Sequence, residues 1–241
     1  MKNREILITS ILSVVLLLMP IWVFAQSAET MSCIADNYRS RALHEALNYE
    51  EALEICNEGL AFFQPIESDY PEELAGIYGI RAEIYSRWGK YEDAIPDYNK
   101  AIKLAPDYLY LHMNLGRIYI KMGETERQYY QKAIELYSYV IMADSGNNFP
   151  FMYRAETYHL LGENDQAMAD INSALALSDG YWETHYIKAR ILFSQGECEK
   201  ALEALNYALV LENFDEEPFF SLRPPLLMLK AQIESMISNE S

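Results

Sequence analysis

The sequence of 241 residues predicts an all-α protein made of about five helix–turn–helix repeats and closed by a C-terminal helix. Three observations support this prediction. A set of residues recurs with one period, hydrophobic residues make up 51% of the chain, and there are only ten glycines and nine prolines. A chain of this length can form a repeat array with a continuous core.

The period is visible in four aligned series of residues. One series of glycines is spaced by 34, 39 and 34 residues, and one series of alanines by 39, 34 and 34. The members are Gly89, Gly123, Gly162 and Gly196; Ala94, Ala133, Ala167 and Ala201; Tyr98, Tyr137, Ile171 and Leu205; and Ala101, Val140, Ala174 and Ala208. We expect the glycines at the turns between helices and the alanines where two helices cross closely.

Five extra residues lie between Gly123 and Ala133. We expect this insertion at an edge of the array, with Arg127, Tyr129 and Tyr130 exposed. It is either a second contact surface or a tolerated turn.

The repeated segments resemble one known family. YGIRAEIYSRWGKYEDAIPDYNKAIKLAP has aromatic, small, Tyr, Ala, Tyr, Ala and Pro in order, and FMYRAETYHLLGENDQAMADINSALALS and HYIKARILFSQGECEKALEALNYALVLE follow it without the closing proline. This pattern is similar to the tetratricopeptide repeat (TPR) family, whose unit is a helix–turn–helix of about 34 residues. The resemblance implies a right-handed superhelical array whose first helices line a concave groove.

The predicted organisation follows from these repeats. A degenerate first repeat is expected at 33–66, before four repeats in 67–215. In full, the segments are a leader at 1–25, a linker at 26–32, the degenerate repeat at 33–66, repeats at 75–108, 109–147, 148–181 and 182–215, and a capping segment at 216–238. The apolar face of this last helix carries Leu226, Leu229, Ile233, Met236 and Ile237, and we expect it to cover the open end of the stack.

The first 25 residues have the pattern of an export signal. Lys2 and Arg4 precede an apolar run over 6–24, and Val23 and Ala25 supply small residues before a cleavage site. An uncleaved membrane anchor is the alternative, because the run is nearly long enough to span a bilayer. The positive N-terminal flank directs the rest of the chain outward in both cases. We therefore expect a periplasmic or extracellular protein.

The charge and the cysteines exclude several function classes. A formal charge of −17 argues against nucleic-acid binding, and membrane contact is expected only through an uncleaved anchor. Cys33, Cys56 and Cys198 lack metal-ligand spacing; a Cys33–Cys56 disulfide and a pair of buried thiols both fit. Because the sequence has no phosphate loop, nucleophile elbow or Cys–His dyad, we expect no enzyme, no metal and no cofactor.

Two arginines are candidates for structural ion pairs. Arg81 and Arg154 each lie sixteen residues before an aspartate, Asp97 and Asp170, with the turn glycine midway between. Antiparallel helices place such residues at the same level. We therefore predict two ion pairs within hairpins rather than two anion-binding sites.

The resemblance implies that the groove is lined by the face of the first helices opposite their packing residues. That face carries aromatic residues, methionines and arginines, the types enriched in the cores of protein interfaces. The candidate groove residues are Tyr110, Met113, Arg117, Ile120, Lys121, Phe149, Met152, Glu156, His159, Tyr186, Arg190 and Phe193. An inner face that packs on itself or on the capping helix is the alternative.

The sequence therefore predicts a non-catalytic scaffold or adaptor that binds a peptide or helix of a protein partner in this groove. By analogy of fold, we expect it to serve assembly or support of an extracytoplasmic complex. One alternative is a structural subunit of a larger complex, held through its acidic convex face and termini. Another is a non-catalytic regulator of an enzyme.

Overall fold

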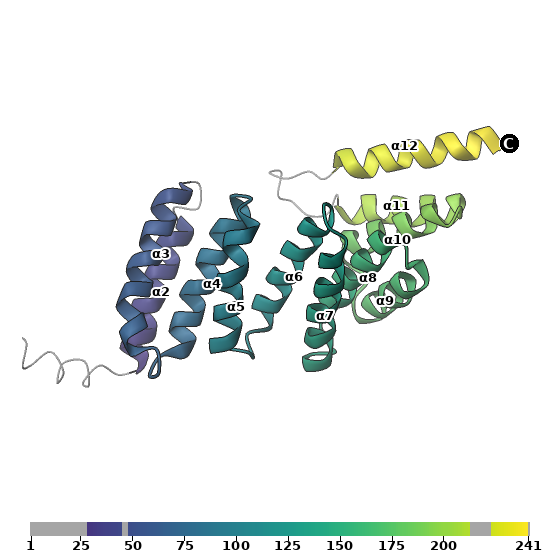
Figure 1. Ribbon diagram of the computed structural model, residues 1–241. Coiled ribbons are helices and arrows are strands. Elements are labelled where there is room, and N and C mark those ends of the chain that lie inside the picture. The colour runs from purple at the N-terminus through teal and green to yellow at the C-terminus, as the bar shows by residue number, and fades with distance from the viewer. Residues whose placement is uncertain (1–27, 45–47, 213–222, 241) are drawn as a thin grey trace, which may run out of the picture. The chain divides into compact units, whose positions relative to one another are not determined.

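The computed structural model describes residues 28–44, 48–212 and 223–240. These residues form helices joined by short turns, with no strand among them (Figure 1). The predicted leader at 1–25 lies outside the described residues. Within them, no helix combines the length and the apolar character needed to cross a membrane.

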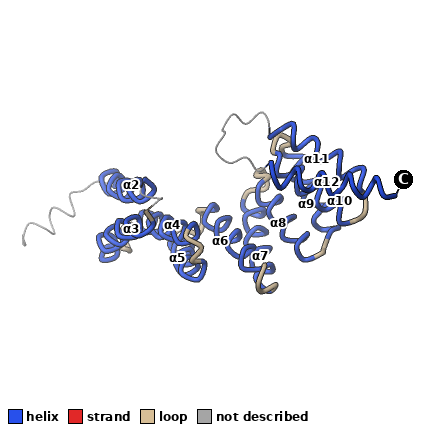
Figure 2. The backbone as a smooth tube through the Cα atoms, turned by 90° about the horizontal axis from the view of Figure 1, so that it is seen from above, coloured by secondary structure: helices blue, strands red, loops and turns tan. Residues whose placement is uncertain are grey.

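The helices pair into antiparallel hairpins, as the repeat pattern predicts. The pairs are α2 (Ala28–His44) with α3 (Tyr49–Phe63), α4 (Pro71–Arg87) with α5 (Tyr91–Leu104), α6 (Leu109–Gly123) with α7 (Gln128–Ala143), α8 (Phe149–Leu161) with α9 (Asn164–Leu177), and α10 (Trp182–Ser194) with α11 (Cys198–Glu212). A 3-10 turn (Gln64–Ile66) follows α3, and α12 (Arg223–Glu240) ends the described chain. The tube in Figure 2 shows how short most of the connecting loops are. The all-α repeat fold is thus confirmed.

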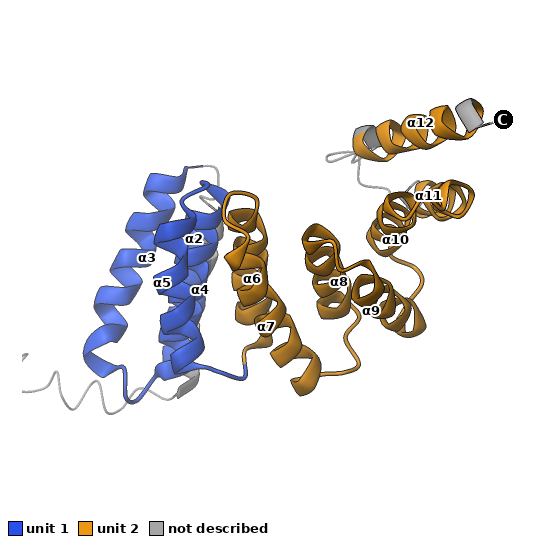
Figure 3. Cartoon of the chain, turned by 45° about the vertical axis from the view of Figure 1, so that its right-hand side comes forward, with its two compact units in different colours: residues 1–107 blue, residues 108–241 orange. Residues whose placement is uncertain are grey.

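The chain divides into two compact units, residues 1–107 and 108–241 (Figure 3). The first unit contains α2 to α5, and the second contains α6 to α12. One predicted boundary in the first unit differs from the structure. Because α2 already begins at Ala28, residues 28–32 are helical rather than part of a linker.

Three of the four repeat glycines occupy turns that favour glycine. Gly89, Gly162 and Gly196 have φ angles of 76°, 83° and 80°, in the left-handed region that side chains rarely adopt. Gly123 is different, because it is the last residue of α6. A Cβ at this position would lie 2.2 Å from Cε1 of Tyr130. The expectation of a turn is therefore wrong for Gly123, whose missing side chain makes room for a tyrosine ring.

The insertion after Gly123 lengthens a helix and does not expose its tyrosines. Tyr130 is only 5% exposed, and Tyr129 is half-buried and stacks on Tyr119 with ring centroids 5.7 Å apart. Only Arg127 is exposed, as expected, and its Nη2 donates to the carbonyl oxygen of Leu161 at 3.0 Å. The expectation of exposed tyrosines is wrong, since apolar ring surface next to a helix crossing packs into it.

Small residues allow the helices of each hairpin to approach closely. Ala94 and Ala101 of α5 are fully buried, and Tyr98 between them is 1% exposed. Pro96 lies on the same helix, in its second turn. The missing N–H of Pro96 removes one hydrogen bond, and the helix still continues to Leu104.

The last helix packs against α11 in the second unit. Leu226, Leu229 and Ile233 of α12 are buried in one cluster with Ala201 and Leu205 of α11. In contrast, Met236 is 42% exposed, although the sequence places it on the same face. Ile237, the last residue predicted on this face, is partly buried and packs against the same cluster, so the amphipathic pattern is wrong only for Met236.

Candidate protein-interaction site

Two arginines form bidentate ion pairs inside their hairpins. Arg81 donates from Nε and Nη2 to the carboxylate of Asp97 at 2.6 and 2.7 Å, and Arg154 donates to Asp170 at 2.7 and 2.8 Å. Both aspartates are 6% exposed. The two pairs predicted from the sixteen-residue spacing are therefore formed, and both arginines are occupied within the fold.

Each of these arginines also contacts the preceding hairpin. Nη1 of Arg81 donates to Oδ1 of Asn57 on α3 at 2.7 Å, and Nη1 of Arg154 donates to Oγ of Ser138 on α7 at 2.9 Å. Sequence reasoning missed these contacts. The sequence did contain an indication of them. Asn57 directly follows Cys56 and Ser138 directly follows Tyr137, and both of these preceding residues are fully buried. Arg81 and Arg154 therefore hold neighbouring hairpins together.

Four of the candidate groove residues meet at one hollow in the second unit. This hollow, called here the α6–α8 hollow, has a volume of about 260 Å³. Tyr110, Met113 and Arg117 line it from α6, and Phe149 and Tyr153 line it from α8. Tyr110 is 49% exposed. The result is a small apolar hollow that solvent reaches, with one cation at its edge.

Arg117 is the charged residue of this hollow, which Asn114 and Asn147 also line. Its side chain is exposed, and Cζ lies 5.8 Å from the ring centroid of Tyr153. Stacking over an aromatic ring orients a guanidinium and leaves its N–H groups available as donors. The hollow can therefore take an apolar side chain while Arg117 donates to an acceptor beside it.

On α8 and α10, most of the charged or polar candidates are already engaged with the protein. Arg190 donates to Glu156 at 3.2 Å and lies 5.7 Å from the ring of Tyr186. His159 donates from Nδ1 to Oδ1 of Asn164 at 2.9 Å, and burial lowers its pKa. This part of the predicted face is thus held together by its own contacts.

Several candidates belong to the packing instead. Ile120 and Met152 are only 7% and 3% exposed, so they are core residues and not part of a free surface. Tyr186 and Phe193 are partly buried and pack against the cluster that includes Leu226 of α12. The alternative that the face packs on the capping helix therefore applies to these two. The last candidate, Lys121, is exposed and pairs with Glu124 at 3.3 Å.

The chemistry-bearing residues elsewhere are buried or dispersed. Cys56 and Cys198 are buried free thiols, and burial raises the pKa of Cys56 to about 12, which keeps it protonated. The side chain of Cys33 lies outside the described residues. Across the described part of the chain, no three His, Cys, Asp or Glu side chains are placed to hold a metal ion.

Comparison with known protein families matches parts of these hairpins. Models of the tetratricopeptide repeat match residues 82–123, 109–139 and 161–218. Of the two helices that line the α6–α8 hollow, α6 lies within a matched segment, whereas α8 meets one only at its last residue.

Two curated relatives are longer than this chain. A TPR repeat-containing protein of Methanocaldococcus jannaschii is 27% identical over 185 residues, which cover 74% of this chain and 30% of that protein. DnaJ homolog subfamily C member 3 of Gallus gallus is 27% identical over 165 residues, which cover 64% and 33%. The chain thus spans about a third of the length of these relatives.

Solved TPR structures share the fold. A thermophilic TPR protein of Thermus thermophilus superposes with a TM-score of 0.60 at 22% identity, covering 84% of this chain and 98% of that one. MamA of Desulfovibrio magneticus RS-1 gives a TM-score of 0.62 at 17% identity, covering 78% and 98%. At these identities the likeness supports the arrangement of helices alone.

Proposed function

We propose that this protein is a non-catalytic interaction scaffold that binds a peptide or helix of a protein partner at the α6–α8 hollow. Proteins built from TPRs generally act as protein-interaction scaffolds. The observation that supports this site is that exposed Tyr110 and Arg117 and half-buried Met113 line one hollow of about 260 Å³. Aromatic residues, methionine and arginine are the residue types that dominate binding energy at interface centres.

The hollow also defines the chemistry of the bound segment. Its volume suits a single medium-sized apolar side chain, and Phe149 and Tyr153 are among the residues that line it. Arg117 lies next to these rings and can donate to a backbone carbonyl or a carboxylate of the same segment. We therefore expect a segment with one apolar anchor and an acceptor close to it.

The cellular place of this function is part of the proposal. The leader at 1–25 supports export, and an exported scaffold would serve assembly or support of an extracytoplasmic complex. Cell fractionation together with N-terminal sequencing of the purified protein tests this. A cytoplasmic protein with an intact N-terminus would contradict the proposed localisation and leave the binding site to be judged separately.

Photocrosslinking in cells that make the protein tests the site itself. A photoreactive phenylalanine analogue is placed at position 114, which lines the hollow and leaves Tyr110, Met113 and Arg117 in place, and in a second strain at position 142 on α7. Met142 is a suitable control because it is 86% exposed and does not line the hollow. We expect a discrete protein adduct from position 114 that is absent or weaker from position 142. Equal adducts from both positions, or none from 114, would contradict the proposal.

A further inference from the structure

The hairpins of this protein differ in one internal ion pair. Hairpins α4–α5 and α8–α9 each contain an arginine and its aspartate. In hairpin α6–α7 both positions are apolar, with Leu115 and Leu136. Hairpin α10–α11 keeps the cation, Lys188, but has Ala204 where the aspartate would be. It is therefore the one hairpin of these four that retains the cation without its acid.

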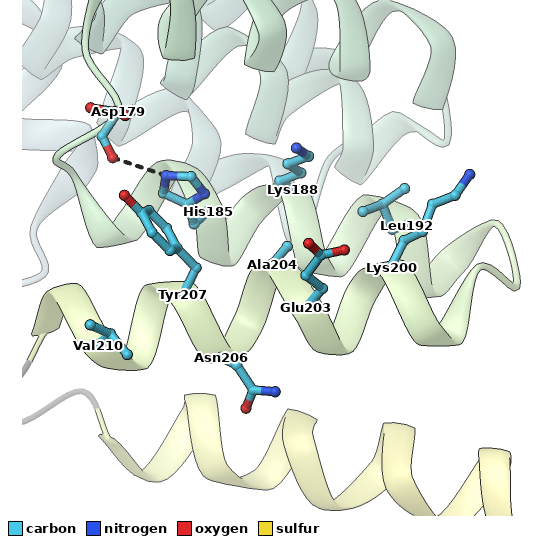
Figure 4. Close-up of a pocket in the computed structure, with 10 residues that line it drawn as sticks. All are labelled: Asp179, His185, Lys188, Leu192, Lys200, Glu203, Ala204, Asn206, Tyr207 and Val210. Carbon is cyan, nitrogen blue, oxygen red and sulfur yellow. Dashed lines mark hydrogen bonds between the residues drawn. The ribbon is translucent and has the colours of Figure 1, made fainter.

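A hollow lies where this acid is missing. It has a volume of about 550 Å³, and both Lys188 and Ala204 line it (Figure 4). We call it the α10–α11 notch. Tyr207 and Val210 of α11 add apolar surface and are 44% and 52% exposed. The notch thus combines the cation of Lys188, an open space beside it, and an exposed apolar surface formed by Tyr207 and Val210.

The cation in the notch has no partner among the described residues. Lys188 is half-buried and forms no ion pair with a described carboxylate. Lys200 also lines the notch, but its ammonium pairs with Glu197. Two carboxylates line the notch, Asp179 and Glu203, and no ion pair joins either of them to Lys188. Glu203 directly precedes Ala204 in the chain and is the carboxylate that could compete for Lys188.

His185 is a further polar group of the notch, and it is uncharged. It donates from Nε2 to the backbone oxygen of Asp179 at 2.9 Å. Burial, followed by the charge of Lys188, lowers the pKa of His185, while the hydrogen bond and the charge of Asp179 raise it. The ring therefore stays neutral at pH 7, and Lys188 is the cation of the notch without an ion pair among the described residues.

We propose that the α10–α11 notch binds an aspartate or glutamate side chain of a protein partner, with Lys188 receiving the carboxylate. The bound carboxylate would take the role that Asp97 and Asp170 have in their own hairpins. An apolar residue next to the acid would rest on Tyr207 and Val210. A half-buried cation without an ion pair among the described residues favours such a ligand, because pairing restores the interactions that burial removes. This site is separate from the α6–α8 hollow and does not depend on the proposed function.

A blocked amino acid is the probe that tests the notch. N-acetyl-glutamate N-methylamide is titrated into the ¹⁵N-labelled full-length protein, and N-acetyl-glutamine N-methylamide serves as the uncharged control. A ligand of about 14 non-hydrogen atoms binds in the millimolar range at ordinary ligand efficiency, roughly 1 mM. We expect saturable shifts of the amides of Lys188, Ala204 and Tyr207 with the glutamate probe and at least fivefold weaker binding of the glutamine probe.

Four variants separate the roles of the charges. Lys188→Met should abolish the shifts, whereas Lys200→Met, which removes an already paired cation from the same notch, should leave them. Glu203→Gln should tighten binding, because it removes the competing carboxylate. Lys188→Arg/Ala204→Asp should abolish binding while the protein stays folded, because the variant carries the same pair as hairpins α4–α5 and α8–α9.

Three results would overturn the proposal. The first is that the amide resonances of the notch show no saturable shift up to about 50 mM of the glutamate probe, a concentration well above the dissociation constant of roughly 1 mM expected from ligand efficiency. The second is equal binding of the two probes. The third is binding that survives in Lys188→Met or in the folded Lys188→Arg/Ala204→Asp variant.

Discussion

Removing Asp170 tests the claim that its ion pair is structural. In Asp170→Ala, the guanidinium of Arg154 loses two charge-assisted hydrogen bonds of 2.7 and 2.8 Å. It keeps its hydrogen bond to Ser138 and its positions over the rings of Phe151 and Tyr158. The Arg154 side chain is 19% exposed, so most of it stays away from water. Breaking a buried pair costs about 3–5 kcal/mol, and partial exposure with these remaining contacts lowers the expected loss to about 2–4 kcal/mol.

Urea unfolding at pH 7 measures this loss. Far-UV circular dichroism and tryptophan fluorescence both monitor the unfolding, and agreement between them checks that it is two-state. Glu135→Ala, an exposed acid on α7, is the control and should change the unfolding free energy by about 0.5 kcal/mol or less. Hairpin α6–α7 suggests a rescue, because it has leucines at both positions, Leu115 and Leu136. Arg154→Leu/Asp170→Leu should therefore recover most of the loss. An Asp170→Ala protein as stable as wild type, or a double variant as unstable as the single one, would refute the reasoning.

Three further predictions concern packing, pH and thiol reactivity. Gly123→Ala should lower the unfolding free energy, measured in urea, by about 1–3 kcal/mol, because the new Cβ would overlap the ring of Tyr130. The loss should be smaller in a Tyr130→Leu background, and equal losses in both backgrounds would contradict this explanation. Burial lowers the pKa of His112 in the folded protein. Between pH 6.5 and this lowered pKa the unfolded chain therefore binds more protons than the folded protein does, so the unfolding free energy should fall as the pH falls through this range. His112→Phe should flatten this part of the stability profile by at most about 1.4 kcal/mol per pH unit, and an unchanged slope would count against it. In a Cys33→Ser/Cys198→Ser background, Cys56 should react with a thiol reagent at pH 8 only in denaturant, because burial raises its pKa to about 12; rapid labelling of the folded protein would disprove the burial.

The fold could be predicted because its signal is repeated. Four aligned series set the hairpins, and the spacing between Arg154 and Asp170 placed both residues level on facing helices. The insertion was harder to interpret. Nothing in a single sequence shows that Gly123 ends a helix under the ring of Tyr130, since the other repeat glycines all serve turns.

The site was predicted only in part, for a physical reason. Helical periodicity gives the direction in which a side chain leaves its own helix, but not which neighbouring element covers it. Tyr110 and Arg117 remain accessible at a hollow, whereas Met152 points in a similar direction and is buried. The α10–α11 notch was missed because it is marked by a missing aspartate, at the position of Ala204. This absence becomes informative only once the ion pairs of hairpins α4–α5 and α8–α9 are known.

The central claim is that the α6–α8 hollow binds a protein segment, and the affinity of the segment captured by photocrosslinking tests it most directly. Calorimetry would compare wild type with Tyr110→Ala/Met113→Ala/Arg117→Ala and with a control variant of exposed residues on α7, Gln131→Ala/Glu135→Ala/Met142→Ala. If each central residue contributes about 1 kcal/mol or more, the first variant should bind at least roughly 100-fold more weakly, and the control should bind within about twofold of wild type. Equal affinities of wild type and the first variant, with both proteins folded, would contradict the claim.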